Sequence, residues 1–261
     1  MDSTRKVAIV TGSATGVGAA TALMLAQRGF DVAVNYSRSE AEAKQTQAQC
    51  EQAGARTLLL RGDVSQDADC CAIVDATMQQ WGRLDTLVNN AGVSVFAEAA
   101  AWDALDASTF ARIMGVNVVG AFQMVRACTP HLKAARGSIV NVSSIAGALG
   151  IGSSIPYIAS KGALNSMTLH LARTLAPDVR VNAVCPGLIT SRWFVEGVGQ
   201  SGFEKTKAAY EATAPLGVPC SPEDVADAIV WLIHSRTVTG ELLLLDSGMH
   251  LGSRALPQPR R

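Results

Sequence analysis

The sequence is poor in aromatic residues and in charge, and its cysteines and histidines lack the spacing typical of metal ligands. Aromatic residues make up 5% of the 261 residues, and charged residues make up 17%. Basic and acidic side chains balance at 22 each, so the composition gives no reason to expect nucleic acid or an anionic membrane as a partner. The six cysteines include no Cys-x-x-Cys pair and the four histidines are unpaired, which argues against a metal site.

Long apolar runs are also missing from the sequence, and none is long enough to span a bilayer. The segment M-D-S-T-R-K-V-A-I-V-T-G lacks the apolar core and the cleavage site of a signal peptide, so we expect a cytoplasmic protein. In that compartment the cysteines are reduced, and we expect several of them to be small core residues. Cys185 lies close to a motif described below and is a candidate for oxidation.

What the sequence does contain is an alternation of apolar, β-rich runs with longer helical patterns. Hydrophobic residues make up 48% of the chain, which is enough for a sizeable core. The expected strands cover residues 6–12, 31–36, 55–64, 84–92, 137–144, 179–187 and 240–248. The expected helices cover residues 16–29, 39–53, 66–81, 103–134, 155–176 and 222–235.

The expected strands are short, continuous apolar runs, which is typical of strands buried on both faces of a parallel sheet. Helical crossovers between parallel strands then predict an α/β fold, a doubly wound seven-stranded parallel sheet with helices on both faces. We expect a single domain over residues 1–261. Residues 188–217 are too long for a routine connection and form a candidate substrate lid. The polar, proline-containing residues 252–261 are expected to form an arm or a disordered tail.

A glycine-rich turn links the first expected strand to the first expected helix. This turn, T-G-S-A-T-G-V-G, runs from Thr11 to Gly18. Its glycines allow a tight turn, close approach of the backbone to a phosphate, and close packing of helix on strand. The N–H groups and the positive dipole end at the helix N-terminus then suit a pyrophosphate. This context predicts a Rossmann-type dinucleotide site, and the alternative is a tight turn without a ligand.

The end of the second expected strand indicates which dinucleotide binds. A carboxylate there would bind the adenosine ribose and repel a 2′-phosphate, but the sequence is N-Y-S-R-S at residues 35–39. Arg38 can hold a phosphate through charge-assisted hydrogen bonds, together with the hydroxyls of Ser37 and Ser39. We therefore expect NADP(H) in preference to NAD(H), which stays open. The alternative is that Arg38 is a solvated loop residue.

Further motifs follow in a fixed order along the chain. They are D-V at 63–64, N-N-A-G at 89–92, Asn117 within G-V-N-V-V-G, Ser144 at the end of I-V-N-V-S-S, Y-I-A-S-K at 157–161, and C-P-G-L-I-T at 185–190. Together with the glycine turn, these motifs make residues 5–251 resemble the short-chain dehydrogenase/reductase family. The resemblance implies an oxidoreductase that transfers a hydride between a nicotinamide and a carbonyl/alcohol substrate.

The resemblance implies that Asn117, Ser144, Tyr157 and Lys161 are catalytic. Tyr157 and Lys161 are four residues apart, so on a helix they share a face. We expect the ammonium and the positive nicotinamide ring to lower the pKa of Tyr157 below its ordinary value of about 10. Tyr157 would then exchange a proton with the substrate oxygen, and Lys161 would also bind the nicotinamide ribose.

Ser144 lies at the carboxyl end of an expected strand, where its hydroxyl can polarise the substrate carbonyl. Ser143 is the adjacent competitor, and the family spacing of thirteen residues before Tyr157 selects Ser144. The family role of Asn117 is to hold a water that relays protons between Lys161 and solvent. We expect a local irregularity of the helix at Asn117.

The resemblance also implies which residues bind the cofactor. The positions at 63–64 are expected beside the adenine and those at 186–190 beside the nicotinamide amide, with turn chemistry as the alternative for the short motifs. The expected set is Gly12, Ala14, Thr15, Gly16, Val17, Gly18, Tyr36, Ser37, Arg38, Asp63, Val64, Asn90, Ala91, Gly92, Tyr157, Lys161, Pro186, Gly187, Ile189 and Thr190. An apolar substrate pocket is expected from Phe96, Leu149, Ile151, Trp193 and Phe194, each of which has core packing as the alternative.

The function expected from these residues is an NADPH-dependent carbonyl reductase similar to bacterial 3-oxoacyl-(acyl-carrier-protein) reductases. The alternatives are an alcohol, sugar or steroid dehydrogenase and, in another class, a dinucleotide-binding sensor without turnover. A sensor would not need all four catalytic residues. Its partner is expected to be a small molecule, and the family resemblance implies a homo-oligomer, a tetramer or a dimer, through residues 103–134 and 155–176 and the last strand.

Overall fold

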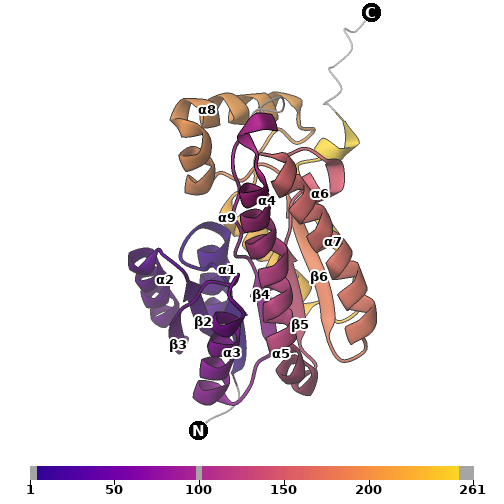
Figure 1. Ribbon diagram of the computed structural model, residues 1–261. Helices are drawn as coiled ribbons and strands as arrows, with labels where there is room; N and C mark the ends of the chain where they lie inside the picture. The colour runs from indigo at the N-terminus through magenta and orange to yellow at the C-terminus, as the bar shows by residue number, and fades with distance from the viewer. Residues whose placement is uncertain (1–4, 98–101, 253–261) are drawn as a thin grey trace, which may run out of the picture.

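The computed structural model of the protein describes residues 5–97 and 102–252. Seven strands form one parallel sheet in the order β3-β2-β1-β4-β5-β6-β7 (Figure 1). The strands are β1 (Lys6–Val10), β2 (Phe30–Tyr36), β3 (Thr57–Arg61), β4 (Thr86–Asn89), β5 (Ser138–Val142), β6 (Arg180–Pro186) and β7 (Leu242–Leu245). The strand order reverses between β1 and β4, which is the switch point where such sheets bind ligands.

Helices cover both faces of the sheet. They are α1 (Gly16–Gln27), α2 (Glu40–Gln52), α3 (Asp67–Trp81), α4 (Ala107–Met114), α5 (Ala121–Ala135), α6 (Ala146–Leu149), α7 (Ile155–Leu175), α8 (Arg192–Thr213) and α9 (Pro222–His234). Along β1, Ala8 and Val10 belong to a core with α1, α2 and α9, whereas Val7 and Ile9 face a second core with α3, α5 and α7. This burial on both faces explains the continuous apolar runs and confirms the predicted fold class.

The structure differs from the sequence-based expectations mainly in two long segments. The helix expected over residues 103–134 is divided into a 3-10 turn (η1, Trp102–Ala104), α4, a π-helical stretch (η2, Gly115–Gly120) and α5. The lid candidate at 188–217 contains α8, which the sequence analysis missed and which is kinked at Gly199. Most strands are also shorter than expected, because the expected ranges included glycine and polar residues that belong to the adjoining loops. Apart from Gly252, the expected tail lies outside the described residues.

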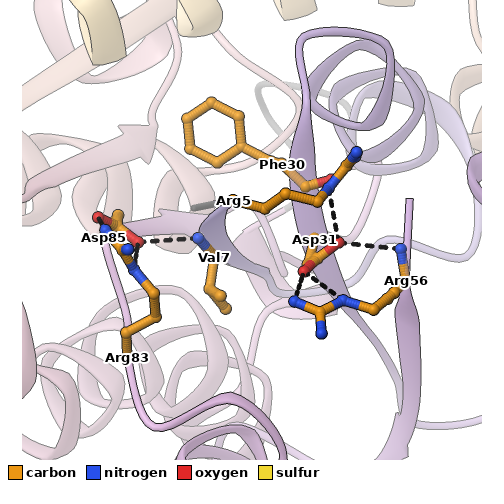
Figure 2. A network of polar contacts seen from close by, with 7 residues as sticks. All are labelled: Arg5, Val7, Phe30, Asp31, Arg56, Arg83 and Asp85. Atoms are coloured by element: carbon orange, nitrogen blue, oxygen red, sulfur yellow. Dashed lines mark hydrogen bonds and ion pairs between the residues drawn. The ribbon is translucent and has the colours of Figure 1, made fainter. Parts of the chain in front are cut away.

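At the amino ends of the strands, a buried carboxylate is held by two arginines (Figure 2). Asp31, the second residue of β2, is fully buried and forms ion pairs with Arg5 and Arg56. The backbone N–H of Arg56 also donates to Asp31 Oδ1 at 3.0 Å. These contacts join the start of β1 to β2 and to the residue before β3, and they compensate a charge that would be costly to bury alone.

A second carboxylate, that of Asp85, lies at the same end of the sheet beside β4 (Figure 2). Asp85 accepts a hydrogen bond from the Val7 N–H at 2.8 Å and forms an ion pair with Arg83 at 2.6 Å. Gly137 lies against the Asp85 backbone, where a Cβ would be 2.4 Å from the carbonyl oxygen. Polar contacts of Asp85 therefore connect the starts of β1 and β4. The position of Gly137 before β5 leaves no space for a side chain.

The cysteines are free, and all except Cys71 are buried, so the expectation that several are core residues is confirmed. Cys185 is fully buried, and burial raises the pKa of its thiol to about 11, so the expectation that it is prone to oxidation is wrong. Residues 5–97 and 102–252 contain no group of three metal-ligating side chains. No helix in these ranges is long and apolar enough to cross a membrane.

Candidate active site

The loops that carry the sequence motifs leave the carboxyl ends of the parallel strands. The glycine turn follows β1, the N-N-A-G segment follows from β4, Ser144 comes after β5, and residues 187–191 follow β6. Helix α8 lies over this edge of the sheet (Figure 1). Because ligands of open α/β sheets bind outside the carboxyl ends of the strands, this edge is the candidate active site.

The glycine turn needs glycine for two different reasons. Gly12 has a φ of 60°, in the left-handed region that residues with a side chain rarely adopt. At Gly18, a Cβ would lie 2.4 Å from Asn90 Nδ2 and from the Gly12 carbonyl oxygen. The turn is therefore packed so tightly against the loop after β4 that a side chain at Gly18 has no space.

Two asparagines hold the glycine turn from within the fold. Asn90 Nδ2 donates to the carbonyl oxygens of Thr11 and Gly12, both at 2.9 Å. Asn35 Oδ1 accepts from the Gly12 N–H at 3.1 Å, and its Nδ2 donates to two carbonyl oxygens in and after β3. The Asn90 amide thus positions the turn, and Asn35 is a positioning residue that the sequence analysis missed. The signal was present, as an asparagine that follows the apolar run Val32–Val34 within a buried strand.

Three of the four candidate catalytic side chains come together between β5 and α7. Lys161 Nζ lies 5.6 Å from the centroid of the Tyr157 ring and donates to the Val142 carbonyl oxygen at 2.8 Å. Ser144 lies beside the Tyr157 phenol, and its Oγ donates to the Pro186 carbonyl oxygen at 3.4 Å and accepts from the Ala146 N–H at 3.1 Å. A hydroxyl, a phenol and an amine therefore share one corner of the site.

Burial shifts both titratable groups of this cluster. Burial raises the pKa of Tyr157 to about 12, and the hydrogen bond with Ser144 opposes that rise. Burial lowers the pKa of Lys161 to about 8, because little of this side chain reaches water. The expected fall in the Tyr157 pKa is therefore wrong for the chain by itself, since desolvation of the phenolate outweighs the other effects. A phenol with a raised pKa is protonated at neutral pH and can donate its proton.

The two adjacent serines have different partners. Ser143 is buried, and its Oγ donates to Asn165 Oδ1 at 2.6 Å and to the Lys161 carbonyl oxygen at 3.3 Å. These contacts tie β5 to the middle of α7. Of the pair, Ser144 is the one beside Tyr157, in agreement with the motif spacing.

Asn117 lies in the π-helical stretch η2, so the irregularity expected there is confirmed. Its Oδ1 accepts from the Val93 N–H at 2.8 Å, and its Nδ2 donates to the Val93 carbonyl oxygen and to Ser160 Oγ, both at 3.0 Å. A Cβ at Gly92 would lie 3.5 Å from Asn117 Oδ1 and 3.7 Å from Lys161 Nζ. The Asn117 amide therefore fixes the loop after β4 close to Lys161, and its part in a proton relay stays a prediction.

The residues expected around the adenosine half lie at the ends of β2 and β3. Tyr36 is buried, whereas Ser37 and Arg38 are exposed. In the part of the chain that the structure describes, Arg38 forms no ion pair, so its guanidinium is available to an anion. The Asp63 carboxylate accepts hydrogen bonds within its own turn, and Val64 is buried.

The segment after β6 is fixed by its backbone. The Pro186 carbonyl oxygen accepts an N–H from the loop after β5 at 3.0 Å. Gly187 packs under α8, where a Cβ would meet a hydroxyl at 2.6 Å. Ile189 forms an isolated parallel bridge with Cys220, and the Thr190 hydroxyl donates to the Cys220 carbonyl oxygen at 3.2 Å. The residues expected beside the nicotinamide therefore form a rigid rim of the site.

Three of the five expected pocket residues come together. The ring centroid of Phe96 lies 5.2 Å from that of Trp193 and 5.1 Å from that of Phe194. Ile151 instead lines a cavity of about 260 Å³ whose lining includes none of the candidate catalytic residues. Leu149 is the last residue of α6 and is half-buried. The aromatic residues, not the aliphatic ones, therefore form the wall beside the catalytic cluster.

Comparison with known proteins gives the family. A family model described as enoyl-(acyl carrier protein) reductase matches residues 12–250. A crystal structure of a Burkholderia xenovorans protein assigned as a short-chain dehydrogenase/reductase is 39% identical, covers 96% of this chain and 100% of its own, and superposes with a TM-score of 0.88. The chain belongs to the short-chain dehydrogenase/reductase family. It is therefore an oxidoreductase, and its family binds NAD(P).

Other short-chain dehydrogenases/reductases similar to this chain carry names with different substrates. A Streptomyces violaceoruber protein, assigned as ketoacyl reductase 2 of the granaticin polyketide synthase, is 43% identical over 247 residues, with 94% of this chain and 96% of that protein covered. The L-fucose dehydrogenase of Mus musculus is 35% identical over 252 residues, with 95% and 89% covered. Family membership thus gives the class of reaction and leaves the substrate open.

The glycine turn fits the dinucleotide that short-chain dehydrogenases/reductases bind. Helix α1 has no acidic side chain in its first turn, and its N-cap, Thr15, makes no side-chain hydrogen bond to the helix. The first N–H groups of α1 are therefore left for an anion such as a pyrophosphate. A Cβ at Gly16 would meet nothing within 4 Å, so the turn is open at this position.

Proposed function

We propose that the chain is an NADP(H)-dependent carbonyl reductase of the 3-oxoacyl reductase type. The observation that carries the proposal is the cluster of Ser144, Tyr157 and Lys161 at the carboxyl ends of the strands, with the Tyr157 phenol beside Ser144 and its ring 5.6 Å from the Lys161 ammonium. The name of the Streptomyces relative, a ketoacyl reductase, supports a ketone substrate.

The proposed mechanism assigns one task to each side chain. Ser144 holds and polarises the carbonyl oxygen of the substrate. Tyr157 donates its phenolic proton to that oxygen as the carbonyl carbon accepts a hydride, and its raised pKa keeps this proton in place until then. Lys161 stabilises the phenolate that remains. The nicotinamide, when bound, supplies the hydride.

The proposed choice of NADP(H) rests on the residues after β2. Arg38 is exposed and unpaired within the described residues, and no carboxylate occurs at positions 35–39. A 2′-phosphate would accept charge-assisted hydrogen bonds from Arg38 and further bonds from Ser37 and Ser39. The first turn of α1, from Gly16, would hold the pyrophosphate, and Lys161 would bind the nicotinamide ribose.

A sugar dehydrogenase is the second candidate, because the mouse relative is an L-fucose dehydrogenase. A panel of a 3-oxoacyl thioester, a steroid ketone and L-fucose, offered with each nucleotide and followed by nicotinamide absorbance, separates the two. Reduction of the thioester with NADPH is expected. Oxidation of L-fucose without ketone reduction would favour the second candidate.

The variant Tyr157→Phe tests the acid/base assignment. Turnover should fall about 10²–10⁴-fold while NADPH still binds, because only the proton donor is lost. The matched control is Tyr210→Phe, which removes a buried hydroxyl that donates to the Asp246 carbonyl oxygen at 2.6 Å and should affect stability more than turnover. Turnover like that of the wild type in Tyr157→Phe would overturn the assignment.

We further propose that the chain is one domain, in which residues 188–217 are a substrate lid, and that it forms a homo-oligomer. The position of α8 over the site supports the lid, which should gain hydrogen-exchange protection when NADPH binds. Exposed apolar side chains on α5 and α7, among them Phe122 and Leu169, support an oligomer, which light scattering would detect. The cytoplasmic location expected from the sequence stays a prediction.

A further inference from the structure

A row of aromatic rings leads from the candidate catalytic tyrosine into α8. The ring centroids of Tyr157 and Trp193 lie 6.1 Å apart, those of Trp193 and Phe96 5.2 Å, and those of Phe96 and Phe194 5.1 Å. Phe203 continues the row at 5.9 Å from Phe194. In a chain with 5% aromatic residues, five of them gather at this one place.

The row is built into the fold. A Cβ on Gly197 would lie 2.0 Å from the Phe96 ring, so this ring packs directly on the backbone of α8. The Ala97 N–H donates to the Ser153 carbonyl oxygen at 2.9 Å and holds the loop that carries Phe96. Phe203 is buried at the other end. Phe96 and its neighbours therefore form a fixed surface, because the Phe96 ring packs directly against the α8 backbone at Gly197.

Trp193 is the member of the row that meets solvent next to Tyr157. Its exposed fraction is 41%, and its ring is tilted by 42° to that of Tyr157. The charged neighbours of Trp193 are engaged with each other, because Arg192 forms ion pairs with Glu42 and Glu196, each at 3.0 Å. The surface beside Tyr157 is thus aromatic, and the described charged side chains next to Trp193 are already paired.

We propose that Trp193 is a specificity-determining residue that selects carbonyl compounds with a flat, uncharged aromatic ring attached to the carbonyl carbon. The inference rests on the proposed carbonyl reductase function. Such a ring would lie against the indole while its carbonyl oxygen reaches Ser144 and Tyr157. Aromatic pairs attract one another beyond the gain from burial, in the tilted and edge-to-face geometries that this row already uses. A saturated ring of the same size gains burial alone.

The test compares acetophenone with cyclohexyl methyl ketone, which share a carbon skeleton and differ in the flatness of the ring. The quantity measured is the ratio of kcat/KM for the two ketones. The difference in intrinsic reactivity between the ketones is the same for every variant, so it cancels when the ratios of two variants are compared. In Trp193→Leu, which keeps an apolar side chain without a ring, the preference for acetophenone should fall about two- to tenfold. Trp193→Phe should retain most of the preference.

Two further variants act as checks on this ratio. Gly197→Ala should also lower it, because the added methyl displaces Phe96 and leaves Tyr157 and Lys161 unchanged. Trp231→Ala is the matched control, since Trp231 is an exposed tryptophan on α9, and the ratio should stay at the wild-type value. Thermal unfolding of each variant shows that it is folded.

Calorimetric titration with the same two ketones provides a readout that needs no turnover. The wild type should bind acetophenone more tightly than cyclohexyl methyl ketone, and Trp193→Leu should lose this difference. If both ketones are reduced and the ratio is the same in the wild type, Trp193→Leu and Trp193→Phe, the inference is overturned and the carbonyl reductase function stands. If the wild type binds acetophenone preferentially but reduces neither ketone nor the 3-oxoacyl thioester, the proposed function fails and the aromatic selectivity stands.

Discussion

Both ends of the parallel strands bury charged side chains, but only at the amino ends do these charges have partners of opposite charge among the described residues. At the amino ends, Asp31 and Asp85 are buried, and each carboxylate is compensated by arginine and by a backbone N–H. At the carboxyl ends, Lys161 is equally buried, yet among the described residues no carboxylate pairs with it. Its Nζ instead donates to the Val142 carbonyl oxygen and faces the Tyr157 ring.

The difference shows where this molecule gains stability and where it gives stability up. A buried charge with matched partners is compensated. Burying a lysine without a carboxylate partner instead makes folding less favourable and lowers the pKa of the lysine. Strongly shifted pKa values of this kind gather at functional sites. Changes at one end of the strands should therefore affect stability, and changes at the other should affect chemistry.

The largest effect is expected at Lys161. Lys161→Met should reduce turnover by at least about 100-fold, because the phenolate of Tyr157 loses its stabilising cation. The folded-state pKa of about 8 lies below the ordinary 10.5, so between these values the unfolded chain binds more protons. The wild type should therefore gain stability relative to Lys161→Met as the pH rises from about 8 to 10.5. Urea unfolding of both proteins across this window measures the gain, and a constant difference would contradict it.

At the amino ends, Asp31→Asn should lower the free energy of unfolding by about 2–3 kcal/mol while leaving kcat/KM unchanged. The isosteric amide keeps the acceptor for the Arg56 N–H and removes the charge that Arg5 and Arg56 compensate. Asp75→Asn, an exposed position on α3, is the control and should change stability by less than about 0.5 kcal/mol. A loss of activity without a loss of stability would break the division between the two ends.

An exposed cation at the carboxyl ends should act on the cofactor alone. Arg38→Ala should raise the Kd for NADPH about ten- to hundredfold, the effect of one charge-assisted contact, and should leave the Kd for NADH unchanged. Arg28→Ala, at the exposed C-terminal end of α1, is the matched control. Equal losses for both nucleotides, measured by fluorescence titration, would rule out recognition of a 2′-phosphate by Arg38.

The smallest effect on activity is expected from an ion pair that, unlike those of Asp31, is exposed to solvent. Arg192 on α8 pairs with Glu42 on α2 at 3.0 Å, and both side chains are partly exposed. Exposed pairs contribute little because solvent screens them, so Glu42→Gln should change kcat/KM less than about fivefold. The change should vanish in high salt, because salt screens exposed pairs. A large effect that persists in high salt would show that this pair is as strong as those at the amino ends.

The order of apolar runs was sufficient to predict the sheet, the family resemblance predicted the irregular helix at Asn117, and motif spacing predicted that Ser144 is the serine beside Tyr157. These features depend on short segments with a defined order, so they can be recognised without knowing distances. The apolar runs likewise predicted seven strands, although the expected ranges extended beyond the strand ends. In the strand expected at 55–64, for example, β3 ends at Arg61, before the Asp63 turn begins.

The remaining features depend on three-dimensional contacts that a linear pattern does not contain. Helix α8 was missed because Gly197, Gly199 and Gly202 are typical of a loop, whereas in the structure Gly199 forms a kink and Gly197 lies under Phe96. The motif shows a lysine near Tyr157, but it does not show the desolvation that raises the pKa of the phenol in the chain without a cofactor. Burial and packing are collective properties, and they decide these details.

The amides that hold the glycine turn have a thermodynamic consequence for ligand binding. Because Asn35 and Asn90 hold the turn through the fold itself, its backbone is ordered independently of any dinucleotide. Ordering one backbone residue costs about 1–2 kcal/mol of conformational free energy, and a flexible loop would subtract that cost from the affinity. Here the loss of entropy occurs during folding, so it is not subtracted from the affinity for the dinucleotide.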